Sequence, residues 1–192
     1  MTRQNDLVPP AFALSVPRAG VAFPLAPTLG RFVERVRSVA PVGDRARRVD
    51  RLPDGRTSFV FRELERGRGD VTVVGPVTRA RLKDARGFRR AISFELKPGW
   101  STPLLGVGAS HITDRYVDIE DLWGHAGRDL LAALLRTDDL GELVERVGGA
   151  FAKRFELATE PAAAGLARRA ARLFEDPSVR VEHVAARLGV TS

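Results

Sequence analysis

Residues 57 to 75 read TSFVFRELERGRGDVTVVG, and this stretch decides the fold class. Its first part, 57–64, and its last part, 70–75, are rich in the aromatic and β-branched residues that favour strands. The turn-forming cluster ERGRGD at 65–70 joins the two parts. The stretch therefore predicts a β-hairpin.

A third strand is predicted where RRAISFELKPG, at 89–99, alternates in character. Ile92, Phe94 and Leu96 share one face of this strand, and the Pro98-Gly99 pair then turns the chain. Several short strands separated by turns favour a small β-barrel or sandwich over a parallel sheet.

The first 55 residues are irregular and rich in proline. Within them, LGRFVERVRSV at 29–39 places Phe32, Val33, Val36 and Val39 on one side of a helical wheel. This spacing predicts a short amphipathic helix over 29–39.

After His111 the apolar spacing becomes helical. We expect amphipathic helices over 118–135 and 139–155, with cap residues at 137–139, and a third helix opened by Pro161. On this third helix we expect one face toward the core, with Leu166, Ala170, Leu173 and Phe174. We expect the opposite face toward solvent, with Arg168, Arg169 and Arg172.

The last stretch, VRVEHVAARLGVTS at 179–192, carries one more apolar stripe: Val181, Val184, Ala185 and Leu188. Gly189 suits the left-handed residue that ends many helices, and Thr191-Ser192 resembles the cap of a further helix. The strand region followed by these helices predicts an α+β fold.

Composition narrows the function classes. The formal charge of +7 permits an anionic partner, although the arginines are interleaved with acidic residues along the chain. The absence of cysteine excludes disulfides, thiolate catalysis and cysteine-based zinc sites. No apolar run reaches the length of a membrane span and the N-terminus lacks a signal-peptide core, so we expect a cytoplasmic protein without a membrane partner.

The sequence offers no catalytic constellation. His111, His125 and His183 are scattered, so we expect no metal site. The carboxylates at 114–121 lie around a helix start, where negative charge is favourable. No Ser-His-Asp order and no phosphate-cradling glycine loop is present, so we expect neither a cofactor nor an enzyme.

The aromatic residues are the candidate ligand-binding residues. Phe59, Phe61, Phe94 and Trp100 lie on or beside predicted strands, and binding pockets are largely apolar. The alternative is that these four residues fill the core of the barrel, which in a small barrel leaves little free space.

The order of several short motifs resembles the sensor domain of AraC-type transcriptional regulators. The similarity is carried by GFRRAISFELKPGWSTPLLGVGASHITDRYVDIEDLWG at 87–124, with PDGRTSFVF at 53–61 and the strand that ends at Gly75. The tail VEHVAARLGVTS at 181–192 is similar to the opening of the family's DNA-binding domain.

The resemblance implies a cupin-like β-barrel with the irregular N-terminal segment over 1–115, a helical connector or dimerisation region over 116–176, and over 177–192 the first helix of a helix-turn-helix domain. It implies a regulatory chain that binds an unidentified small-molecule effector, forms a homodimer and contacts DNA through the full-length protein. The recognition helix would follow residue 192, and Arg180 and Arg187 would contact DNA phosphates.

Two other classes stay open at this point. A stand-alone cupin-like enzyme would need a metal or a convergent acid and base, and an interaction module would dimerise without binding a small molecule.

Overall fold

The computed structural model describes residues 21–22, 25, 27–39, 47–51, 53–85 and 87–190, and its fold is mixed α+β, as predicted. The strands are β1 (Val21–Ala22), β2 (Val33–Val39), β3 (Arg47–Arg51), β4 (Ser58–Glu65), β5 (Arg68–Val74), β6 (Arg81–Ala85), β7 (Arg90–Leu96) and β8 (Tyr116–Asp118). The helices are α1 (Pro27–Gly30), α2 (Ser101–Leu105), α3 (Ala109–Ile112), α4 (Ile119–Trp123), α5 (His125–Leu134), α6 (Leu140–Leu157), α7 (Ala162–Leu173) and α8 (Val181–Leu188).

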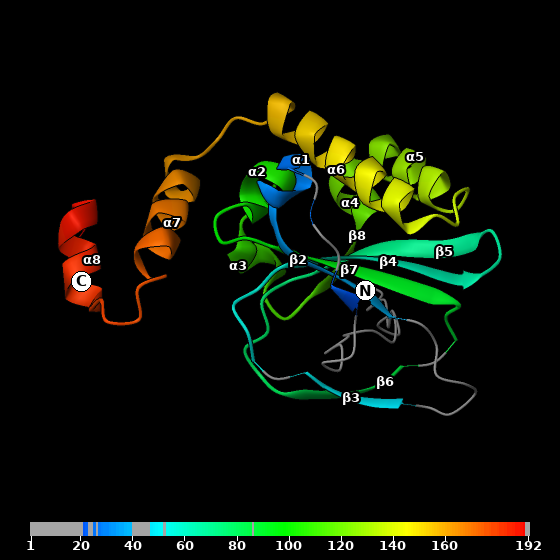
Figure 1. Ribbon diagram of the computed structural model, residues 1–192, viewed down its shortest axis with the longest axis horizontal. Helices are drawn as coiled ribbons and strands as arrows, with labels where there is room; N and C mark the ends of the chain where they lie inside the picture. Colours follow the sequence, from blue (N-terminus) through cyan, green and yellow to red (C-terminus); the bar gives the residue numbers. More distant parts are fainter. Residues whose placement is uncertain are drawn as a thin grey trace, which may run out of the picture.

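Six strands form one antiparallel sheet in the order β1-β2-β7-β4-β5-β8, and β3 pairs with β6 in a separate ribbon (Figure 1). The predicted hairpin is present as β4 and β5, in which Phe59 lies opposite Val73. The third predicted strand is β7, between β2 and β4.

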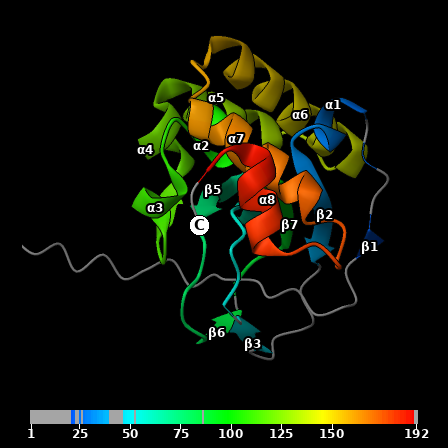
Figure 2. The same cartoon turned by 90° about the vertical axis from the view of Figure 1, so that its left-hand side faces the viewer.

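The six-stranded sheet is open, whereas the strand pattern predicted a small barrel or sandwich and the resemblance implied a cupin-like β-barrel. Its edges are β1 and β8, which do not pair with each other. Helices α1, α2, α4, α5 and α6 cover one face, and the β3-β6 ribbon lies on the other side (Figures 1 and 2). Because the helices bury the apolar face, the sheet does not need to close on itself to remove that face from water.

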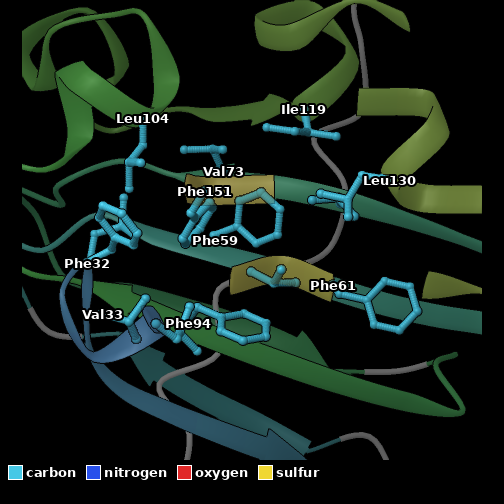
Figure 3. Packing of buried hydrophobic residues seen from close by; sticks show 14 of the residues in the cluster. Phe32, Val33, Phe59, Phe61, Val73, Phe94, Leu104, Ile119, Leu130 and Phe151 are labelled. Atoms are coloured by element: carbon cyan, nitrogen blue, oxygen red, sulfur yellow. The ribbon is translucent and has the colours of Figure 1, made fainter. Parts of the chain in front are cut away.

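The core lies between the sheet and these helices. Phe59, Phe94 and Val73 point from the strands toward Leu104 of α2 and Phe151 of α6 (Figure 3). The Phe59 ring packs edge-on against Phe151, with 5.2 Å between the ring centroids. One apolar face on each strand and one apolar stripe on each helix therefore make a single core.

The segment 29–39 is not a helix as predicted. Helix α1 ends at Gly30, and β2 then pairs with β7, so that Val36 lies opposite Phe94. The pairing register shifts between Val33 and Arg35, as at a β-bulge. Such a shift lets Val33 and Val36, three residues apart, both be buried, which is why a helical spacing occurs in a strand.

The helices after β8 follow the predicted order with one division. Gly124, with φ of 58°, separates α4 from α5 where one helix was expected. Helix α6 begins at the predicted cap, because the Asp139 carboxylate accepts a hydrogen bond of 2.7 Å from the Glu142 amide. Helix α8 ends at Gly189 in the left-handed conformation, as predicted. No helix in the described part of the chain is both long and apolar enough to cross a membrane.

Candidate functional site

Helix α7 packs on the turn that follows β7. Gly99 has φ of 77° in this turn, and a Cβ atom there would lie 2.6 Å from the Ala164 carbonyl oxygen and 2.8 Å from Arg168 Cγ. The Arg168 guanidinium donates a hydrogen bond of 3.1 Å to the Gly99 carbonyl. The sequence therefore places glycine where the backbone of α7 leaves no room for a Cβ atom.

Arg168 also stacks on the next residue of the turn. Its guanidinium carbon lies 4.5 Å from the centroid of the Trp100 ring, and the guanidinium forms an ion pair with Glu160. Its side chain is only 18% exposed, so the prediction that Arg168 faces outward is wrong. The turn presents a carbonyl oxygen and an aromatic ring to α7. A guanidinium can donate a hydrogen bond to the first and stack on the second, whereas an apolar side chain cannot donate the hydrogen bond.

The other predicted faces of α7 are only partly right. Arg169 and Arg172 are exposed as expected. Leu166, Ala170 and Leu173 are partly buried, but Phe174, expected inside, is 45% exposed. The sheet and the helices that cover it, which we call the sheet domain, contact α7 along only one narrow strip. Helix α7 therefore does not bury its whole apolar stripe.

A groove of about 850 Å³, which we call the Trp100 groove, lies beside this contact. From the sheet domain it is lined by Arg31, Glu34, Arg56, Lys97, Pro98 and Trp100, and from α7 and the residues after it by Arg168, Ala171, Arg172, Phe174 and Glu175. Five of these residues are cations and two are carboxylates. The groove is therefore strongly basic.

The cations of the groove differ in their partners. Arg56 donates to Glu34 at 3.1 Å and to Glu95 at 2.9 Å, so it is neutralised locally. The Lys97 ammonium donates at 2.5 Å to the Gly30 carbonyl, which carries no charge.

Arg31 and Arg172 make no ion pair with any carboxylate that the structure describes. Arg31 instead lies over Phe155 and Trp100, at 4.3 and 5.3 Å from the ring centroids. Positive charge thus remains available in the groove.

The four aromatic residues predicted to bind ligand take two different places. Phe59, Phe61 and Phe94 are at most 1% exposed and pack in the core between the sheet and the helices. Trp100 is 7% exposed and lines the Trp100 groove. A ligand in contact with the three phenylalanines would have to displace core side chains, whereas Trp100 already borders open space.

The face of the sheet turned away from the helices carries buried polar side chains, which were not predicted from the sequence. Arg62 of β4 forms a two-point ion pair with Asp70 of β5, at 2.7 and 2.6 Å, and the Thr72 hydroxyl donates to the same carboxylate at 3.3 Å. Burial raises the pKa of the Asp70 carboxyl and lowers that of the Arg62 guanidinium, since each charged form loses hydration. The alternation of side chains between the two faces of β4 and β5 could have predicted this ion pair, because Arg62 and Asp70 both fall on the face opposite Phe61.

The remaining predicted site residues lie at the surface. Arg180 and Arg187 are exposed at the two ends of α8. The three histidines are exposed as well, and no group of three or more metal-ligating side chains occurs among the residues that the structure describes.

Residues 22–118 match a family model described as Domain of unknown function (DUF6597), and the match covers just over half of the chain. The chain belongs to the DUF6597 family. The matched residues include the strands from β2 to β8, so the DUF6597 domain contains the large sheet except for the start of its edge strand β1, and α4 to α8 follow it. Searches of curated proteins and of solved structures each gave no match. The Trp100 groove lies between the DUF6597 domain and α7.

Proposed function

We propose that this chain is the regulatory portion of an AraC-type DNA-binding transcriptional regulator. In this proposal the DUF6597 domain, with its open sheet in place of a cupin-like barrel, is the sensor, α4 to α7 form the connector and dimerisation region, and α8 is the first helix of a helix-turn-helix domain. Its role is binding and regulation in the cytoplasm, without catalysis. The ordered motifs of residues 87–124 and 181–192 support the proposal.

The contact of α7 with the sheet domain carries the proposal. Gly99 and Arg168 join the two directly, and only the seven residues 174–180 connect the end of α7 at Leu173 with the start of α8 at Val181. A ligand that changes the packing of α7 would therefore change the position of α8. Two-state packing of this kind is a means of coupling an effector to DNA binding.

DNA contact would begin at α8. Arg180 and Arg187 are exposed at its ends and lie free of the core, so their guanidinium groups are accessible to phosphate oxygens. A second helix following Gly189 would read the bases in the major groove.

Reading the coding DNA beyond codon 192 tests the proposal directly. We expect it to continue with a helix that follows Ser192 and to carry a second helix-turn-helix pattern. An immediate stop codon would contradict the proposed regulator, because the chain would then have no recognition helix.

Phosphate contacts by α8 are testable with residues 1–192. Fluorescence anisotropy with a mixed-sequence DNA duplex should give weak binding that falls steeply with salt concentration. Replacing both Arg180 and Arg187 by glutamine should reduce the slope of log K against log salt by about 2, roughly one unit for each lost phosphate contact.

The Arg66→Gln variant is the matched control, because Arg66 is exposed in the turn between β4 and β5, far along the chain from α8. An equal change in slope for Arg66→Gln and the double variant would show that general charge is responsible. Tight, sequence-selective binding by residues 1–192 alone would also contradict the proposal.

A further inference from the structure

We propose that the Trp100 groove binds a small organic anion carrying at least two negative charges, and that this anion holds α7 against the DUF6597 domain. The inference rests on the proposed function only where it makes this anion the effector; the binding site itself does not depend on it.

The cations of the groove outnumber its carboxylates. Three cations, Arg31, Lys97 and Arg172, have no ion pair with a carboxylate in the described part of the chain. Of the two carboxylates in the lining, Glu34 is already held by Arg56. A concave surface with this excess of cations concentrates anions, because its positive potential is only partly screened by solvent.

These cations come from both sides of the groove. Arg31 comes from the turn between α1 and β2, Lys97 from the end of β7, and Arg172 from α7. These elements are distant in sequence and line one groove. An anion with two charged groups can therefore bridge the sheet domain and α7, whereas a single charge would serve one side.

The groove has the size and the side chains of a site for a small organic anion. A volume of about 850 Å³ falls within the range of small-molecule sites, which is roughly 300–1,000 Å³. Arginine guanidinium groups bind carboxylates and phosphates through two parallel hydrogen bonds. Trp100, Pro98 and Ala171 add apolar surface for the carbon skeleton of a ligand.

Docking of α7 depends on few contacts, so a bridging anion would have a large effect on it. The Gly99 carbonyl and the Trp100 ring both hold the single side chain of Arg168. A ligand that binds only when α7 is docked shifts the population toward the docked state in proportion to its occupancy.

Isothermal titration calorimetry with citrate and with 3-phosphoglycerate, two organic anions that each carry at least two charged groups, tests the site, with chloride holding the ionic strength constant. We expect at least one of the two probes to bind with one-to-one stoichiometry. The Arg172→Gln and Arg31→Gln variants should each weaken this binding by about tenfold, since each removes a charge-assisted hydrogen-bond donor.

Arg169→Gln is the matched control, because Arg169 is exposed on the same helix and does not line the groove. Its affinity for the probe should equal that of the wild type. Absence of binding by both probes, or an equal loss for Arg169→Gln and Arg172→Gln, would overturn the proposal.

The anionic group could also come from a DNA phosphate, and competition separates the two sources. If a DNA duplex displaces the probe and Arg172→Gln weakens duplex binding as strongly as probe binding, the groove is a nucleic-acid site and the proposal is overturned. Hydrogen exchange over 162–173 should slow when the probe binds. Slowed exchange in a protein whose DNA binding does not respond to the probe would support the site and reject its role as the effector site.

Discussion

Replacing Gly99 by alanine should release α7 from the sheet domain. The new Cβ atom would lie 2.6 Å from the carbonyl oxygen of Ala164 and 2.8 Å from Arg168 Cγ. The carbonyl belongs to the helix backbone, so the clash is relieved only by moving α7. The φ of 77° adds about 1–2 kcal/mol of backbone strain, because alanine disfavours the left-handed region.

The contacts that undocking would remove set the magnitude. The hydrogen bond from the Arg168 guanidinium to the Gly99 carbonyl contributes about 1.5–3 kcal/mol as a bond from a charged donor. The stacking of Arg168 on Trp100 adds about 0.5–2 kcal/mol. The lower end of their sum, a loss of about 2 kcal/mol, raises the equilibrium constant for opening roughly 30-fold, since 1.4 kcal/mol corresponds to a factor of ten.

Hydrogen exchange followed by mass spectrometry measures this opening. Amides over 162–173 should exchange about 30-fold faster in Gly99→Ala, provided that exchange there proceeds through undocking. Amides of β4 and β7 should change only by the global loss of stability.

The Gly67→Ala variant separates strain from collision. Gly67 has φ of 75° in the turn between β4 and β5, and no atom lies within 4 Å of the Cβ position. Gly67→Ala should lower the free energy of unfolding by about 1–2 kcal/mol and leave exchange over 162–173 otherwise unchanged. If both variants accelerate exchange in α7 equally, close packing of Gly99 against α7 does not hold the helix in place.

Three further predictions concern core packing, a buried ion pair and the first turn of α6. Phe151→Ala should lower the free energy of unfolding in urea by about 3–5 kcal/mol, because the ring is fully buried among aromatic neighbours; a loss below 1 kcal/mol would contradict this packing. Glu63→Gln should cost about 3 kcal/mol, because its carboxylate is 2% exposed and pairs with two arginines, and a neutral result would show that the pair is not retained in solution. Hydrogen bonds from Thr137 and Arg146 hold the pKa of Glu142 below its usual range. The contribution of Glu142 to the free energy of unfolding is therefore complete above about pH 4.3, the unfolded-state pKa, and is lost as the pH falls through the lower folded-state pKa. A carbon-13 NMR titration should therefore show that Thr137→Ala raises the pKa of Glu142, and an unchanged pKa would exclude the hydroxyl as the cause.

The sequence by itself determined the elements whose signal is local. Alternating aromatic and β-branched residues over 57–75 specified the β4-β5 hairpin, because the side-chain period of a strand is two. Asp139 marked the start of α6 and Gly189 the end of α8, because capping satisfies backbone groups only a few residues away.

Tertiary structure decided what depends on distant partners. Phe32, Val33 and Val36 had helical spacing, but pairing with β7 and a shift in register made their segment a strand. Arg168 was expected in water, yet the turn at Gly99 and Trp100 supplies it with a carbonyl and an aromatic face. The Trp100 groove exists only because residues from three separate segments meet beside α7. Strand pairing and the packing of one element on another join residues that are far apart in the chain, and a local sequence pattern does not specify these contacts. Local pattern therefore determines the elements, whereas only the assembled fold brings the cations of the groove together.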